Sequence, residues 1–220
     1  MKLRFFKQDE WPKLSWVATC AQTEGTVDIS HGPMVECRED WLLEGVWDGD
    51  FESGDFDLTD TIFGTGIRLR QDAVTFVSSA TGVDRLWYCR IDQSFFISNT
   101  LPGLLSVTGL SLRPDYPFYT SDIESVQKQG IFSCKKSIPS SGPDIRLLYY
   151  NNLVLGRDGL SECKKPDRTP DIGTFRAYED YLRRTAVNLG ENARAGGRRF
   201  TIDMLVGLSA GYDSIATGVI

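Results

Sequence analysis

The chain has 220 residues, 41% of them hydrophobic and 25% charged, and its 24 basic and 30 acidic side chains give a net charge of −6. This composition indicates a globular protein with a sizeable core, and the acidic balance argues against broad nucleic-acid binding, which needs a surplus of cations. No segment approaches the ~20 consecutive apolar residues of a membrane span, and the start lacks the apolar stretch of a signal peptide. We therefore expect a cytoplasmic protein that binds neither membrane nor nucleic acid.

The cysteines and the single histidine offer no clear catalytic or metal-binding pattern. The thiols are odd in number, widely separated and without a C-x-x-C pair, which predicts reduced cysteines and neither a disulfide framework nor a zinc site. His31 is followed by Gly32 and Pro33, so we expect it in a surface turn. The five cysteines are Cys20, Cys37, Cys89, Cys134 and Cys163.

The first 160 residues are rich in strand-forming runs. Residues 74–79 (VTFVSS), 85–91 (RLWYCRI) and 94–99 (SFFISN) are β-branched or aromatic and are separated by turn residues, so we predict an antiparallel meander of three strands. Residues 101–109 follow, where a proline near the start and a glycine at the end predict a short helix.

The next segments predict a hairpin and then a linker. Residues 145–157 read as two strands around Asn151 and Asn152, a pair that tolerates the positive φ of a tight turn. Charge, prolines and a glycine replace the apolar pattern over residues 161–173, which indicates a linker.

Residues 174–195 are the strongest helix candidate in the chain. Thr174 can act as N-cap, and apolar residues recur at helical spacing, so they predict a packing face. These residues are Phe175, Tyr178, Leu182, Ala186 and Leu189.

The chain closes with a strand, a turn of small residues and the start of a helix. The apolar run 204–208 is typical of a strand buried on both faces. The turn that follows offers backbone N–H groups and a helix dipole to an anion, which suits a phosphate. Asp213 beside that phosphate would need a divalent cation between them, so we predict Mg²⁺ there. The alternative is an ordinary strand-to-helix turn with Asp213 as its N-cap.

This turn, LSAGYDS, resembles the S-G-G-x-D-S signature of the PP-loop ATP pyrophosphatases, with Ala210 in place of a glycine. Residues 74–105 and 131–149 resemble, in order, two segments of asparagine synthetase-like proteins. The resemblance implies an α+β fold. It places a four-layer αββα N-terminal-nucleophile-like sandwich, a glutaminase-like domain, in residues 1–160 and a linker with a helix in 161–197. The first strand, loop and helix of a truncated α/β PP-loop domain then occupy 198–220.

The same resemblance implies an ATP-dependent amide-forming ligase. A substrate carboxylate attacks the α-phosphate of ATP, pyrophosphate leaves, and an amine displaces AMP from the acyl-adenylate. The implied cofactors are ATP and Mg²⁺, and the implied partners are an unidentified carboxylate and an unidentified amine, with homo-oligomerisation left open. The loop residues that would hold ATP and pyrophosphate are Ser209, Ala210, Gly211, Tyr212 and Ser214, and Asp213 would bind the magnesium.

The glutaminase half departs from the family at its nucleophile. The family uses a cysteine exposed by removal of the first methionine, whereas this chain begins Met1-Lys2, and lysine has no thiol to activate. Ser78 and Ser79 replace the family's Arg-Asp pair. We therefore expect the glutaminase fold to be kept and its chemistry lost, with no catalytic residue in it.

Three functions follow for the chain. The first is the N-terminal part of such a ligase, truncated before the adenine pocket is complete and inactive alone. The second is a noncatalytic binding or scaffold module. The third is an active glutamine amidotransferase with Cys20 as substitute nucleophile, although nothing around Cys20 resembles an N-terminal cysteine motif.

Overall fold

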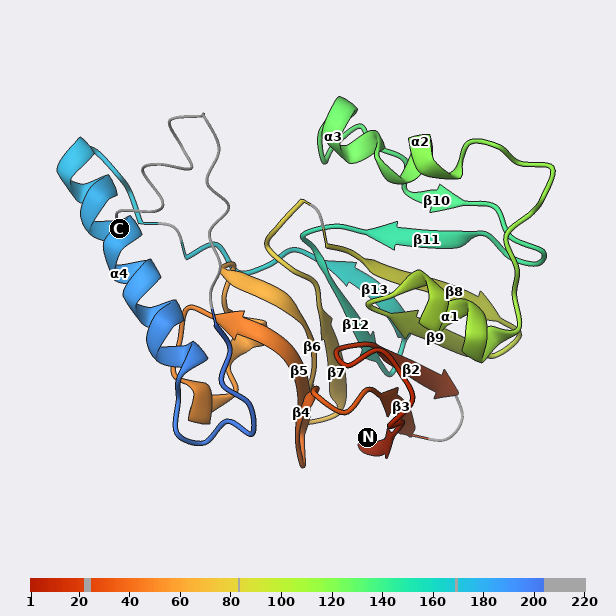
Figure 1. Cartoon of the computed structure of the whole chain (residues 1–220), viewed down its shortest axis with the longest axis horizontal. Helices are drawn as coiled ribbons and strands as arrows, with labels where there is room; N and C mark the ends of the chain where they lie inside the picture. The colour runs from red at the N-terminus through yellow and green to blue at the C-terminus, as the bar shows by residue number, and fades with distance from the viewer. Residues whose placement is uncertain (22–24, 83, 169, 204–220) are drawn as a thin grey trace.

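Two β-sheets that share one hydrophobic core form the centre of the structure (Figure 1). The computed structural model describes residues 1–21, 25–82, 84–168 and 170–203. Within these residues the fold is α+β, with more strand than helix. No helix in the described part of the chain is long and apolar enough to cross a membrane.

The first sheet has seven strands. Only its edge pair β1–β3 is parallel, and its other neighbours run antiparallel. In spatial order the strands are β1 (Lys2–Lys7), β3 (Thr26–His31), β2 (Trp16–Ala21), β9 (Ser94–Ser98), β8 (Leu86–Ile91), β11 (Ile145–Leu148) and β10 (Ser137–Ile138).

The second sheet has six strands, and all its neighbours run antiparallel. In spatial order the strands are β13 (Gly159–Cys163), β12 (Asn152–Gly156), β7 (Ala73–Val77), β6 (Ile62–Arg70), β5 (Trp41–Trp47) and β4 (Glu36–Arg38).

The inner faces of the two sheets make the core. Alternate residues of β3 are buried, as expected for a strand with one face against a partner sheet. Each fully buried aliphatic or aromatic side chain contributes roughly 1.5–3 kcal/mol. The core residues from both sheets include Trp16, Ile29, Ile97, Leu42, Ile67 and Phe76.

Helices cover both outer faces. On the first sheet, α1 (Leu101–Thr108), α2 (Tyr119–Ile123) and α3 (Ser125–Gln129) bury a second apolar cluster. On the second sheet, the 3-10 turns η1 (Phe51–Ser53) and η2 (Phe56–Leu58) complete an aromatic cluster, and α4 (Phe175–Ala193) packs near β5. The N-terminal end of α4 extends away from the sheets (Figure 1).

The expected strands and helices are confirmed where they are described, but two expected pairings are wrong. The three-stranded meander does not form, because β7 pairs with β6 and β12 in the second sheet while β8 and β9 pair in the first. The connection from Ser78 to Arg85 is long enough to cross between sheets that pack about 10 Å apart. The short spacing in the sequence had predicted a tight turn in this connection.

The predicted hairpin around Asn151 and Asn152 does not form either. β11 belongs to the first sheet and β12 to the second, so this connection is another crossing. Tyr150 supplies the positive φ, 64°, and Asn152 is buried at the start of β12. The hairpin partner of β12 is β13, which continues to Cys163, inside the expected linker. The expected last strand, residues 204–208, lies outside the described residues.

Candidate functional site

The predicted phosphate loop lies outside the described residues. Ser209, Ala210, Gly211, Tyr212, Asp213 and Ser214 all follow Asp203, where the description stops. The ATP and Mg²⁺ contacts therefore stay predictions. Among the described residues, no group of three or more His, Cys, Asp or Glu side chains can hold a metal ion.

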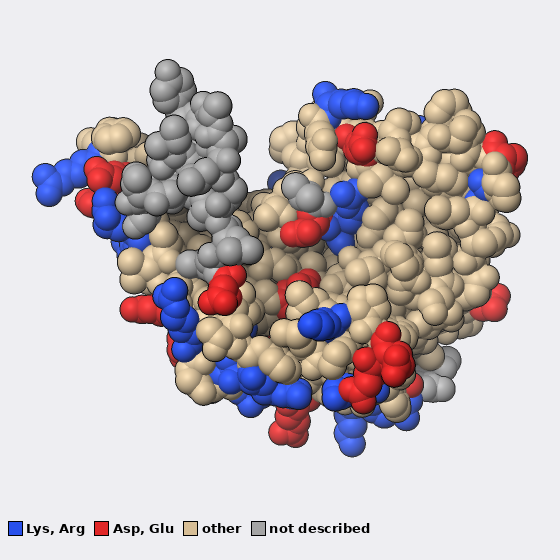
Figure 2. Space-filling view, viewed as in Figure 1, with Lys and Arg blue, Asp and Glu red and all other residues tan. Residues whose placement is uncertain are grey.

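Polar side chains gather instead at one end of the sandwich. At this end β5 and β6 of the second sheet meet the start of β2 and the end of β9 of the first. The connection between β7 and β8 lies at the same end, since Ala80 N donates to Ile62 O at 2.7 Å. Figure 2 shows this face of the molecule hollowed beside the side that carries α2 and α3, with acidic and basic atoms in the hollow.

Glu44 of β5 is the centre of this polar end. Its Oε1 accepts a hydrogen bond from Thr65 N at 2.8 Å and another from Thr65 Oγ1 at 2.7 Å. Asn99 Nδ2 donates to the same oxygen at 3.4 Å. Trp16 ties both partners to the first sheet, because its indole N–H donates to Thr65 Oγ1 and its backbone N–H to Asn99 Oδ1, each at 2.9 Å.

Burial raises the pKa of Glu44 to about 7, and the hydrogen bonds from Thr65 and Asn99 oppose that shift. The carboxyl can therefore hold or release a proton near neutral pH. The neighbouring backbones are unusually close, since Gly45 and Gly64 face each other with φ of 144° and 116°. A Cβ at Gly45 would lie 2.1 Å from Phe63 O, so only glycine fits beside this carboxyl.

Lys165 is a second buried ionisable group at this end. Its Nζ donates to Ser78 O at 2.7 Å and to Asn152 Oδ1 at 2.9 Å. Burial lowers the pKa of Lys165 to about 7, with Asp60 partly opposing the shift. Lys165 is the second residue after β13, so it fixes the start of the connection toward α4 to the sandwich.

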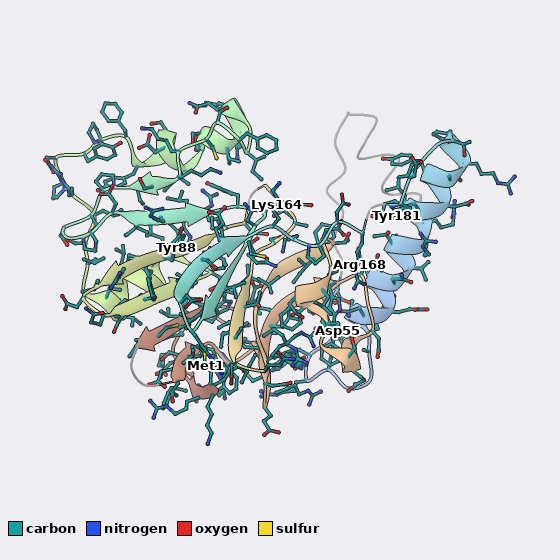
Figure 3. All side chains as sticks on the ribbon, turned by 180° about the vertical axis from the view of Figure 1, so that it is seen from behind. Met1, Asp55, Tyr88, Lys164, Arg168 and Tyr181 are labelled. Atoms are coloured by element: carbon teal, nitrogen blue, oxygen red, sulfur yellow. The ribbon has the colours of Figure 1, made fainter. Side chains whose placement is uncertain are left out.

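The first residue lies at the opposite end. β12 begins with Asn152 at the polar end and runs to Gly156, which lines a pocket of about 240 Å³ with Met1. Figure 3 shows Met1 and Lys164 at opposite ends of the sandwich. The described residues that line the Met1 pocket include no cysteine. The polar end is therefore not built around the chain start.

The thiols of the sandwich are poorly suited to nucleophilic attack. Burial raises the pKa of Cys20 to about 12 and that of Cys89 to about 11. A thiol must ionise to attack, so such shifts oppose reactivity. Cys20 is fully buried in the inter-sheet core, as a structural cysteine would be.

His31 is not in a surface turn, and that prediction is wrong. It ends β3 and is buried, with Nδ1 2.8 Å from Gly32 O and Nε2 3.6 Å from Cys37 Sγ. Burial raises the pKa of Cys37 to about 12 and lowers the pKa of His31. The pair therefore rests as neutral thiol and neutral imidazole, not as an activated ion pair.

Glu44 lets the described polar end hold a proton. The Thr65 hydroxyl there is already used in hydrogen bonds within the fold. Thr65 is 2% exposed and is bonded to both Trp16 and Glu44. One feature of the sequence marks this end, a lone carboxylate in the apolar run WLLEGVW. Lys165 carried no comparable signal, because it lies in a charged segment. A scan against protein-family models, a search of curated proteins and a search of solved structures each found no match to this chain.

Proposed function

We propose that the chain is the N-terminal part of an asparagine synthetase-like, ATP-dependent ligase. In this proposal residues 1–160 are a four-layer αββα, N-terminal-nucleophile-like sandwich whose glutaminase chemistry is lost, and residues 198–220 begin a PP-loop domain. The observation that carries the proposal is the pair of sheets that share one core, with helices on both outer faces. The order of strands, α1 and α4 along the chain agrees with the order that the resemblance predicts.

The proposed reaction is carboxylate activation followed by amide formation. A substrate carboxylate attacks the α-phosphate of ATP, pyrophosphate leaves, and an amine then displaces AMP. Backbone N–H groups of Ser209, Gly211 and Ser214 would hold the pyrophosphate portion, and Asp213 would bind Mg²⁺. Without a glutaminase, the nitrogen comes from free ammonia or from an amine substrate.

The loss of glutaminase chemistry has support from three features. Lys2 stands where the family has its thiol, Met1 lies away from the polar end, and burial raises the pKa of Cys20 to about 12. A buried, protonated thiol cannot attack glutamine at a useful rate. The described chain alone should therefore release no ammonia from glutamine.

Isothermal titration of ATP and Mg²⁺ into the full-length protein tests the nucleotide-binding step of the ligase proposal. Asp213→Ala should abolish magnesium-dependent ATP binding and leave the fold intact, whereas Asp203→Ala, a nearby exposed control, should not change it. Ala210→Gly should be neutral or raise ATP affinity, because glycine relaxes the turn. Equal ATP affinity of the wild type and Asp213→Ala would mean that the loop is an ordinary turn and does not bind phosphate.

A noncatalytic binding or scaffold role is the second candidate. The desolvated thiols and the structural engagement of Thr65 favour it for the sandwich itself. Absence of ATP binding in the full-length protein would select this role over the ligase.

The amidotransferase alternative has a simple test. Ammonia release from glutamine that disappears in Cys20→Ala would establish it and contradict the proposed loss. We expect the wild type and Cys20→Ala to give the same background.

A further inference from the structure

One turn in the helical cover of the first sheet holds an aromatic side chain almost entirely in solvent. Phe132, in the turn that follows α3, is 98% exposed. Figure 1 shows α2 and α3 at the periphery of the molecule, beside the edge strand β10. Single exposed apolar residues are common on protein surfaces, so the exposure of Phe132 carries an inference only together with its surroundings.

The backbone around Phe132 is fixed on the C-terminal side of the aromatic ring. Cys134 N donates to Gly130 O at 3.0 Å, and the Cys134 side chain is buried in the apolar cluster that α1, α2 and α3 cover. Lys135 N donates to Ser125 Oγ of α3 at 2.8 Å. Because the turn is bonded to α3 and packed into this cluster, the fold itself holds Phe132 toward solvent.

The sequence around Phe132 is basic. Residues 125–143 contain three lysines and no aspartate or glutamate, in a chain whose net charge is −6. Lys128 of α3 and Lys135 are exposed. Lys136 is also exposed, and its Nζ donates to a backbone carbonyl of the same turn at 2.8 Å. The exposed aromatic ring therefore lies within a local positive charge.

We propose that the turn of residues 130–136 docks the protein on an anionic lipid surface. In this arrangement Phe132 enters the boundary between headgroups and acyl chains, and the lysines lie over the lipid phosphates. Aromatic rings are favoured at this boundary, and each lysine near an anionic surface adds to the attraction. Such docking needs no spanning helix. It departs from the expectation from the sequence that membranes are not bound, which considered only spanning and signal segments.

A lipid surface fits this turn better than a protein partner does. Specific protein interfaces bury about 800 Å² on each partner and have an apolar core. The turn of residues 130–136 exposes one large apolar side chain among polar and basic residues, which suits a weak, reversible contact with a fluid surface. The inference goes beyond the proposed ligase function, because it concerns a surface of the sandwich and does not depend on ATP.

Co-sedimentation of the full chain with lipid vesicles tests the docking. The wild type should bind vesicles of equal parts phosphatidylserine and phosphatidylcholine about ten-fold or more tightly than pure phosphatidylcholine vesicles, because the lysines need anionic headgroups. Phe132→Ser should weaken binding to the anionic vesicles about ten-fold, and Lys128→Gln with Lys135→Gln about thirty-fold. The control Phe175→Ser removes a side chain of α4 that is 79% exposed and should not change binding.

Two results of this experiment would overturn the proposal. The first is binding that is absent, or equal for the two kinds of vesicle. The second is a loss of binding in the lysine variant without a loss in Phe132→Ser, which would mean that the turn adsorbs by charge alone. All these variants should keep the wild-type melting temperature, because the changed side chains are exposed.

A tryptophan in place of Phe132 reports insertion directly. Lipids brominated on their acyl chains should quench the added fluorescence of Phe132→Trp when the protein binds, whereas Phe175→Trp should be quenched no more than the five native tryptophans. Equal quenching of the two variants would contradict insertion at this turn. Vesicle binding without ATP binding in the full-length protein would overturn the proposed function and leave this inference intact.

Discussion

The two outer faces of the sandwich are covered in different ways. On the first sheet, α1, α2 and α3 bury a continuous apolar cluster that includes Trp87, Leu104 and Leu147. On the second sheet, the apolar contact of α4 within the described residues consists of Leu189 and Ala193 beside Val46. The rest of its attachment is polar, through Asn188 to Asp48, Asn192 to Gly49 O, and Arg198 to Gly45 O.

This difference indicates two levels of local stability. The helices α1, α2 and α3 bury much apolar surface against the first sheet, so they should unfold together with the sandwich. The interface of α4 is mostly polar and its apolar contact is short, so α4 can open separately. We therefore treat α1–α3 as part of the sandwich and α4 as an attached element that connects it to the chain beyond Asp203.

A matched pair of leucine truncations gives the largest expected effect. Leu104→Ala should lower the free energy of unfolding by about 3 kcal/mol, because Leu104 is fully buried and its removal leaves a cavity. Leu189→Ala should change global unfolding much less and act on α4 alone. Urea denaturation followed by tryptophan fluorescence measures both. Equal losses in the two variants would mean that α4 unfolds with the sandwich.

Glu44 offers a pH test of the junction between the sheets. Its pKa is raised from 4.5 to about 7 in the folded state, so its contribution to stability is fully present below pH 4.5 and is lost as pH rises through 7. Relative to Glu44→Gln, the wild type should lose about 3 kcal/mol between pH 4.5 and 8.

The pH effect should appear in global unfolding and not in the separate opening of α4, because the hydrogen bonds of Glu44 are to Thr65 and Asn99 of the sandwich. Denaturant titrations at several pH values provide the measurement, with the exposed Glu39→Gln as control. Parallel pH profiles for the wild type and Glu44→Gln would contradict the raised pKa.

Glu36 tests the polar attachment of the segment after α4. Glu36→Ala removes the acceptor of two backbone N–H groups, at Arg199 and Phe200, and should weaken that attachment by about 1–2 kcal/mol. Limited proteolysis should cut between residues 198 and 203 several-fold faster, while Glu39→Ala leaves the rate unchanged. Faster cutting throughout the sandwich would show that the effect is not local.

The helix N-caps give the smallest effects and the closest comparison. Thr100 accepts the Gly103 N–H at 3.3 Å in α1, and Thr174 accepts the Ala177 N–H at 3.2 Å in α4. Each Thr→Ala change should cost about 1 kcal/mol. For Thr100 the loss should appear in the melting temperature, and for Thr174 only in amide exchange near the start of α4. A melting-temperature shift for Thr174→Ala would argue against separate opening.

Local elements were predictable from the sequence, and their partners were not. α1 and α4 have caps and periodic apolar residues close together in the chain, so their bounds follow from local pattern. Sheet membership depends on which faces meet, and the segment from Ser78 to Arg85 gives no sign that it crosses between sheets.

The candidate site was harder to predict for the same reason. Glu44 has partners at Thr65 and Asn99, far along the chain, and its raised pKa arises from burial that only the packed sheets create. Lys165 likewise gains its environment from Ser78 and Asn152. Residues 209–214 were recognised from a short motif, and that interpretation stays a prediction.

Native-state hydrogen exchange of the whole chain under increasing urea tests the separate attachment of α4 most directly. Amides of α1 and β8 should exchange only through global unfolding, whereas amides between Tyr178 and Leu189 should exchange through an opening of lower free energy and smaller urea dependence. If the α4 amides instead merge with those of α1 and β8 in a single global transition, the two covers are equivalent and the account is wrong.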